Sequence, residues 1–178
     1  MKFPSVVSAV LLAGAAFAGV PAPPPPKPLI FAPLVYYNDG CMRCHGAQGE
    51  LYKPGMATRW TGDLLREKVD AMNHAYGVPG CNGEALDAET ALHRAWDRGQ
   101  TFVAWTATEG RSLEGEATRA KGARAVVKGK AFPLDLSEGL WTWEMPAGVE
   151  PKDVTIEAGD GASTTTLRLA YERFSHRQ

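Results

Sequence analysis

The sequence predicts an α+β protein, with a small all-α unit followed by a small antiparallel β-sheet or sandwich. Apolar residues recur at helical spacing in two stretches before Trp105, and short alternating runs separated by turns follow it. The formal net charge of −1 argues against nucleic acid or an anionic membrane surface as the main partner. Changes in composition and residue pattern along the chain divide it into four segments: 1–18, 19–28, 29–105 and 106–178.

The first segment, 1–18, has the features of a signal peptide. Lys2 supplies a positive charge, and the apolar run 6–18 is too short to cross a bilayer. The small-x-small tripeptide 16–18 precedes Gly19 in the pattern that signal peptidases cleave. We therefore expect a periplasmic or otherwise extracytoplasmic protein with no transmembrane segment after cleavage. An uncleaved N-terminal anchor is the alternative.

The next segment, 19–28, is rich in proline. Such a run forms a stiff polyproline II stretch, which joins neither a helix nor a central strand. We expect a spacer between the cleavage site and the folded body, with a ligand for a proline-recognition domain as the alternative.

Three helices are expected in the segment 29–105. A short helix over 33–37 leads the chain to Cys41. The second begins at Asp63, and its apolar stripe consists of Leu65, Val69, Met72 and Tyr76. The third is capped by Asp87 and ends at Gly99, and its apolar face consists of Ala88, Leu92, Ala95 and Trp96.

The most informative motif is the pentapeptide that begins at Cys41 and ends with Cys44 and His45. Two thiols at this spacing, followed directly by a histidine, are typical of covalent haem attachment. The thiols add to the two vinyl groups of the porphyrin, and His45 is placed to bind the iron as the proximal ligand. The motif predicts one haem c. The alternatives are a structural zinc half-site, which needs a second ligand pair, and a thioredoxin-like dithiol, which needs a βαβ context.

The stretch from Tyr36 to Trp105 resembles a class I cytochrome c. The resemblance rests on the haem motif with Gly46, the following glycine-rich loop, and the sequence Pro-Gly-Cys-Asn-Gly-Glu before the last helix. In that family an aromatic residue of the last helix packs across the first, which implies a contact of Trp96 with Tyr36 or Tyr37. A proline carbonyl also commonly orients the proximal histidine, and Pro54 is the best-placed residue here.

The chain departs from this family at the distal ligand. The usual methionine position is Val78, which cannot bind iron, so we considered the other residues that can: Met56, Met72, His74, Cys81 and His93. Met72 is expected to pack in the core because it lies on an apolar stripe. His93 is expected on a solvated face, since it lies opposite Leu92 between two acidic neighbours.

Cys81 is the distal ligand that the sequence favours. It lies in the expected loop, and it remains unpaired if the other two of the three cysteines hold haem. A thiolate binds ferric iron strongly and lowers the potential. A buried structural thiol or an intermolecular disulfide is the alternative.

A second resemblance supports Cys81. The stretch from Trp60 to Trp96 is similar to the haem domains of the Sox complex A subunit and of thiosulfate dehydrogenases, in which a cysteine of this loop binds iron. The Sox subunit carries an arginine four residues before that cysteine, whereas this chain has Gly77. Only Arg59 and Arg66 remain as candidates for holding an anionic substrate.

The segment 106–178 is expected to be β-rich, with turns at glycine and proline positions. No catalytic set, metal cluster or phosphate loop is visible in it, and His176 is expected to be solvated. The expected strands are 123–127, 140–144, 154–157 and 166–171.

A basic stretch from Arg111 to Lys130 carries six basic residues and two acidic ones, a local charge of +4. Such an edge can dock an acidic redox partner protein, although a simple solvated surface is the alternative. Together with the motif and the export signal, it predicts an exported monohaem c-type cytochrome that transfers electrons as a carrier or as a subunit of a redox complex. The alternative is a haem enzyme, or a subunit of one, that oxidises thiosulfate or a related sulfur compound. A haem-based sensor would need an output domain, and the β-rich segment is not recognisable as one.

Overall fold

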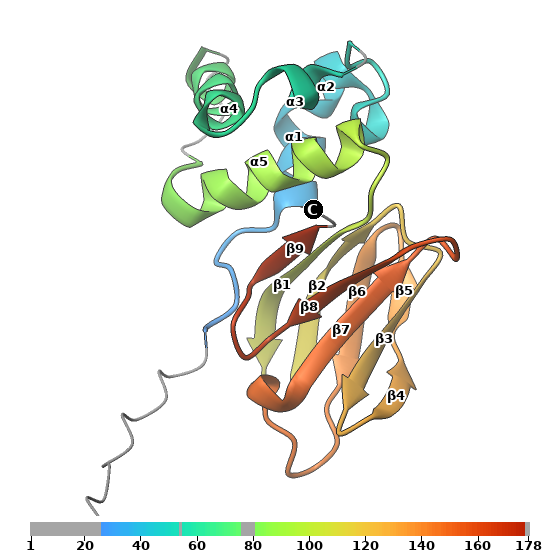
Figure 1. Ribbon diagram of the computed structural model, residues 1–178. Helices are drawn as coiled ribbons and strands as arrows, with labels where there is room; N and C mark the ends of the chain where they lie inside the picture. The colour runs from blue at the N-terminus through green and yellow to red at the C-terminus, as the bar shows by residue number, and fades with distance from the viewer. Residues whose placement is uncertain (1–25, 54, 76–80, 177–178) are drawn as a thin grey trace, which may run out of the picture.

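The computed structural model describes residues 26–53, 55–75 and 81–176, in which helices lie above a β-sandwich (Figure 1). The predicted α+β class is confirmed. The expected signal peptide, most of the proline-rich spacer, Pro54 and residues 76–80, with Tyr76 of the expected apolar stripe, lie outside the described residues. Within the described part of the chain, no helix combines the length and the apolar character that a membrane span requires.

The helices begin close to the expected positions, with one exception. The first begins at Pro33 and the second long helix at Asp63, as predicted. The last begins at Gly83, four residues before the expected cap Asp87, and its N-cap residue is Asn82, which has an extended backbone. The elements are α1 (Pro33–Gly40), α2 (Met42–His45), η1 (Ala47–Gly49), α3 (Met56–Arg59), α4 (Asp63–Ala75) and α5 (Gly83–Asp97).

The β-sandwich consists of two antiparallel sheets that enclose a shared apolar core. The five-stranded sheet has the order β5-β6-β2-β1-β9 and the four-stranded sheet the order β4-β3-β7-β8. The strands are β1 (Phe102–Glu109), β2 (Ser112–Thr118), β3 (Gly122–Val127), β4 (Lys130–Pro133), β5 (Asp135–Ser137), β6 (Leu140–Glu144), β7 (Val154–Gly159), β8 (Thr164–Arg168) and β9 (Phe174–His176), with η2 (Pro151–Asp153) before β7.

Three of the four expected strands are present at β3, β6 and β7, and the fourth is β8, which begins and ends earlier than predicted. The strands β1, β2, β4, β5 and β9 were not expected. β1 begins at Phe102, within the stretch assigned to the helical unit, and its first four residues are all buried. A strand buried on both faces lacks alternation, so its pattern does not distinguish it from a helix segment.

Helices cover the outer face of the five-stranded sheet, and this is why β1 is buried on both sides. Val103 and Trp105 face the sandwich core, whereas Phe102 and Ala104 belong to a second core shared with α1 and α5. The indole Nε1 of Trp96 on α5 donates a hydrogen bond to Thr118 Oγ1 on β2 at 3.0 Å. The helical unit and the sandwich are therefore packed against each other through a continuous apolar contact.

A buried carboxylate joins α1 to β2. Glu116 is fully buried on the outer face of the sheet, where its Oε2 accepts a hydrogen bond from the backbone N–H of Leu34 at 2.8 Å and its Oε1 one from Val35 at 3.2 Å. These are N–H groups of the first turn of a helix, which have no partner within the helix. Burial raises the pKa of Glu116 to about 7 despite these two bonds.

Replacing the Glu116 carboxylate should change how the unfolding free energy depends on pH. Because the folded pKa is raised from 4.5 to about 7, the unfolding free energy is greatest below pH 4.5, falls as the pH rises, and levels off above pH 7. The Glu116 contribution to this fall is about 3 kcal/mol. Glu116→Gln removes it, at a cost of about 1 kcal/mol at low pH for the weakened cap.

Urea unfolding of the wild type and of Glu116→Gln between pH 4 and 8 measures the difference. Glu114→Gln, on the exposed outer face of the same strand, is the matched control. A Glu116→Gln variant with the full wild-type pH dependence would contradict the assignment.

Candidate functional site

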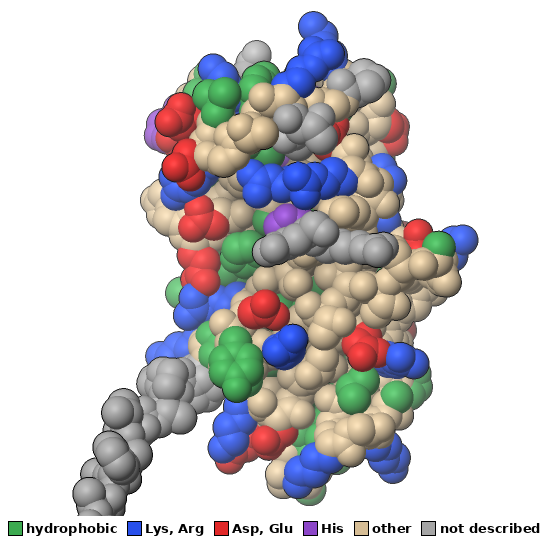
Figure 2. Space-filling view, in the orientation of Figure 1, with side chains coloured by type: hydrophobic (Ala, Val, Ile, Leu, Met, Phe, Trp, Pro, Cys, Tyr) green, Lys and Arg blue, Asp and Glu red, His purple; other side chains and the backbone are tan. Residues whose placement is uncertain are grey.

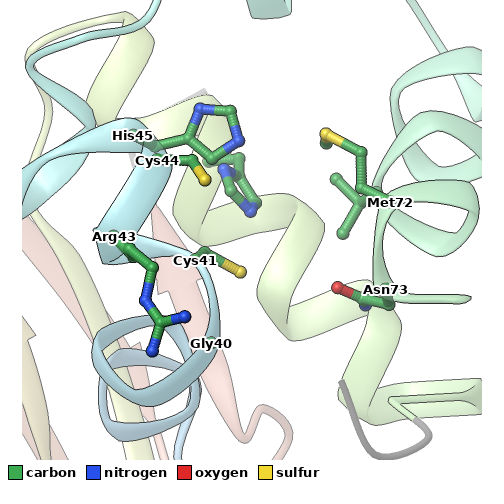
Figure 3. A pocket seen from close by; sticks show the side chains of 9 residues that line it. Gly40, Cys41, Arg43, Cys44, His45, Met72 and Asn73 are labelled. Atoms are coloured by element: carbon green, nitrogen blue, oxygen red, sulfur yellow. The ribbon is translucent and has the colours of Figure 1, made fainter. Parts of the chain in front are cut away.

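A cavity of about 330 Å³ lies between the segment Cys41–His45 and α4. Its size is at the lower end of ligand pockets, which span about 300–1,000 Å³. Figure 3 shows the motif on one side and α4 on the other. The lining residues are Gly40, Cys41, Arg43, Cys44, His45, Val69, Met72, Asn73 and His93.

All three side chains of the motif face this cavity. Cys41 ends α1 and is partly buried, Cys44 is exposed on the short helix α2, and neither is in a disulfide. Both sulfur atoms and the ring of His45 point toward α4 in Figure 3. The chain then turns at Gly46, whose φ of 74° favours glycine and whose carbonyl accepts a 2.7 Å hydrogen bond from the Tyr37 hydroxyl.

The environment of His45 favours the neutral imidazole. Burial lowers its pKa, and so does the nearby ring of His93. A neutral imidazole is the form that binds a metal, so no proton has to be displaced from the coordinating nitrogen.

The opposite wall is formed by three residues of α4: Val69, Met72 and Asn73. Figure 3 shows the Met72 sulfur directed at the motif. Asn73 is only 3% exposed, and its Nδ2 has no hydrogen-bond partner among the described residues. The cavity therefore combines two free thiols with a buried amide that has no partner among the described residues.

These residues fit a covalently attached haem. Cys41 and Cys44 provide the two sulfur atoms for thioethers, His45 the proximal nitrogen, and Met72 a sulfur atom on the opposite wall. The described residues contain no group of three or more His, Cys, Asp or Glu side chains arranged to hold a bare metal ion.

The predicted distal ligand Cys81 does not line this cavity. It is 1% exposed and packs in an apolar cluster with Leu65, Val69 and Leu86. Burial raises the pKa of its thiol to about 12, with a further contribution from Glu89. Ligation by Cys81 would therefore require the loss of the thiol proton.

Two of the other candidates point elsewhere. His74 is exposed, and its Nδ1 lies 2.8 Å from the backbone oxygen of Asp70. Met56 begins α3, where its backbone N–H donates to Asp97, and it does not line the cavity.

His93 was expected on a solvated face, and this prediction is wrong. It is 1% exposed, its Nδ1 is hydrogen-bonded to the hydroxyl of Tyr52, and its Nε2 lies 3.3 Å from Glu89 Oε1. The reason is that α5 is covered by the sheet on one side and by the motif segment and Tyr52 on the other. A histidine opposite an apolar stripe is solvated only if that side of the helix faces water.

Asn73 and Glu89 were not singled out from the sequence. Asn73 lies four residues after Val69 and so continues the apolar stripe of α4, which was the available signal. Glu89 carried no such signal, because a Glu–His pair four residues apart is usual on a solvated helix.

The expected aromatic contact between the first and last helices is confirmed. The rings of Tyr37 and Trp96 lie edge to face, with centroids 4.4 Å apart and an interplanar angle of 82°. Tyr36 instead packs against Phe31. The contact holds the end of α1, and hence Cys41, against α5.

The basic stretch from 111 to 130 does not form one edge. Arg111 and Arg124 are paired with Glu144 and Glu157, and basic and acidic side chains are interspersed on the face in Figure 2. Arg119 and Lys121 follow β2 and line a cleft of about 540 Å³ with Met42 of α2, whereas Lys128 and Lys130 flank the β3–β4 turn at the other end of the sandwich.

Comparison with known proteins found no matching family model, no matching curated protein and no matching solved structure. The function of the chain is therefore inferred from its own residues.

Substitutions at Tyr37 separate the two contacts that hold the motif in place. Tyr37→Phe keeps the ring contact with Trp96 and loses the bond to the Gly46 carbonyl, so we expect a loss of about 1 kcal/mol in unfolding free energy. Tyr37→Ala removes both, at a cost of about 3–5 kcal/mol. Denaturant unfolding measures both values, with Tyr171→Phe, which is 78% exposed, as the control. An unchanged stability of Tyr37→Ala would show that the contact does not support the motif.

Proposed function

We propose that this chain is an exported monohaem c-type cytochrome that transfers electrons, as a carrier or as the cytochrome subunit of a redox complex. Cys41 and Cys44 hold one haem, and His45 is the proximal ligand. The observation that carries the proposal is that all three side chains face one cavity, whose opposite wall presents the Met72 sulfur and the unpartnered Asn73 amide.

In this proposal the protein provides attachment, orientation and exclusion of water, and the haem supplies one-electron chemistry when bound. Val69 and Met72 would form an apolar wall of the haem site, while Tyr37 holds the turn after His45. Cys44 is exposed, so the attached edge of the ring lies near the surface, where a partner protein can approach it.

The partner is proposed to be a redox protein. Within the basic stretch, Arg119 and Lys121 lie closest to the motif, because they share a cleft with Met42. A partner with acidic side chains around its own redox centre would complement them and Arg43.

Electron transfer is favoured over oxidation of a sulfur compound. An enzyme of that kind requires cationic side chains around the open face of the site to hold an anionic substrate. Of the two arginines that the sequence offered for this role, Arg66 is bonded to Asp87 at 2.6 Å and Arg59 is exposed, and neither lines the cavity. Arg43 does line the cavity, but it lies on the motif side, between the two attachment cysteines.

The attachment itself is tested on a denaturing gel. Protein exported from cells with a haem-attachment system should keep peroxidase-active haem stain, and Cys41→Ala with Cys44→Ala should lose it. Cys81→Ala is the matched control and should retain the stain. Haem that acidic organic solvent extracts freely from the wild type would contradict covalent attachment.

The distal ligand is tested by two sulfur substitutions. Because Met72 lines the cavity and Cys81 does not, we expect Met72→Leu to move the ferric spectrum toward high spin, while Cys81→Ser leaves the spectrum and the potential close to wild type. Electron paramagnetic resonance with a redox titration measures both. A high-spin shift and a raised potential in Cys81→Ser alone would instead establish the thiolate ligand that the sequence favours.

A further inference from the structure

Three polar side chains form a buried chain beside the cavity. The hydroxyl of Tyr52 is hydrogen-bonded to Nδ1 of His93, and Nε2 of His93 lies 3.3 Å from Oε1 of Glu89. His93 is 1% exposed and Glu89 0%. The chain begins next to the proximal side of the site, because the Tyr52 ring packs edge-on against His45, with centroids 5.1 Å apart.

Among these three side chains, Glu89 has the most unusual hydrogen bonding. Neither of its oxygens has an aligned hydrogen bond among the described residues, and the contact with His93 is its one close polar neighbour there. A fully buried carboxylate without hydrogen bonds is costly, so a fold retains it only with compensation or for a function.

The groups that face Glu89 do not offer a fixed positive charge. The titratable groups coupled to it are Tyr36, Tyr37 and Cys41 from α1 and its end, Tyr52, Cys81 and Glu116, with His93 from its own helix. Of these, only His93 can become a cation. The charge on Glu89 therefore depends on its protonation and on any charge that is placed in the cavity.

We propose that Glu89 is a proton-binding site coupled to electron transfer, so that reduction of the site is accompanied by uptake of one proton at the Glu89 carboxylate. This rests on the proposed haem function. His93 connects Glu89 to the cavity and to Tyr52, and its two ring nitrogens allow it to accept a proton at one side and release it at the other.

The sign of the coupling follows from charge. The oxidised site carries one more positive charge than the reduced site, and that charge stabilises the ionised carboxylate. When a partner protein donates one electron, this stabilisation is lost, and Glu89 takes one proton from solvent to become a carboxylic acid. One electron and one proton enter together, and both leave when an oxidised partner accepts the electron. Burial, which raises the pKa of Glu89, favours the acid form in the reduced state.

The midpoint potential of the purified haem protein, titrated between pH 5 and 9, tests this coupling. In the wild type the potential should fall with pH, with a slope that approaches 59 mV per unit, because each unit changes the equilibrium constant tenfold in a one-electron couple. Glu89→Gln, which keeps the size and removes the titration, should flatten the slope. Glu84→Gln, an exposed position of the same helix, should keep it.

Infrared difference spectra of the reduced and oxidised wild type give a second readout that needs no variant. Reduction should produce a carboxylic acid band that shifts in heavy water and is absent in Glu89→Gln. A potential that does not change with pH, or a slope and band that survive in Glu89→Gln, would overturn the inference while leaving a covalent, redox-active haem in place. Absence of haem stain in the wild type would instead overturn the proposed function.

Discussion

The Glu116 carboxylate under the first turn of α1 is the interaction on which the arrangement of the site depends. It ties the two leading N–H groups of that helix to the middle of the five-stranded sheet, and the other end of the same helix is Cys41. The position of the motif is thus set by a side chain 71 or more residues away in the chain. Gly115 belongs to the same arrangement, because a Cβ there would lie 2.3 Å from the ring of Trp141, whose Nε1 bonds to the Glu116 carbonyl.

The two faces of helix α5 pack against different parts of the protein. Its apolar residues, with Trp96, pack on the sheet and on Tyr37, and this contact provides the apolar burial that joins the two parts of the protein. Its other side carries Glu89 and His93, which are enclosed by the motif segment and Tyr52. Because both faces are covered, polar side chains that would be solvated on an ordinary surface helix become buried ionisable groups beside the cavity.

In the proposed function, the sandwich also contributes to the surroundings of the haem. Its outer face supplies part of the apolar core beneath α5, and its β2–β3 connection places Arg119 and Lys121 beside α2. A haem held by two thioethers needs little surrounding fold for retention, whereas its orientation and surroundings depend on how firmly α1, α4 and α5 are held. The sheet holds two of these directly.

What the sequence determined by itself was local chemistry and local structure. The stripe through Leu65 and Val69, the aromatic pair of the first and last helices and the alternating strand β6 could be predicted, because each depends on residues a few positions apart or on a recurring packing geometry. The haem that the Cys41–His45 motif predicts stays a prediction. What only the tertiary structure decided was the environment of each side chain. Burial on both faces concealed β1 and enclosed His93 and Glu89. The fold also placed the basic residues of the stretch 111–130 at separate locations, and it placed Met72 but not Cys81 in the lining of the cavity. The physical reason is that burial, pairing and access to the cavity are set by contacts between segments far apart in the chain, such as Glu116 with Leu34, and these contacts leave no periodic trace in the sequence.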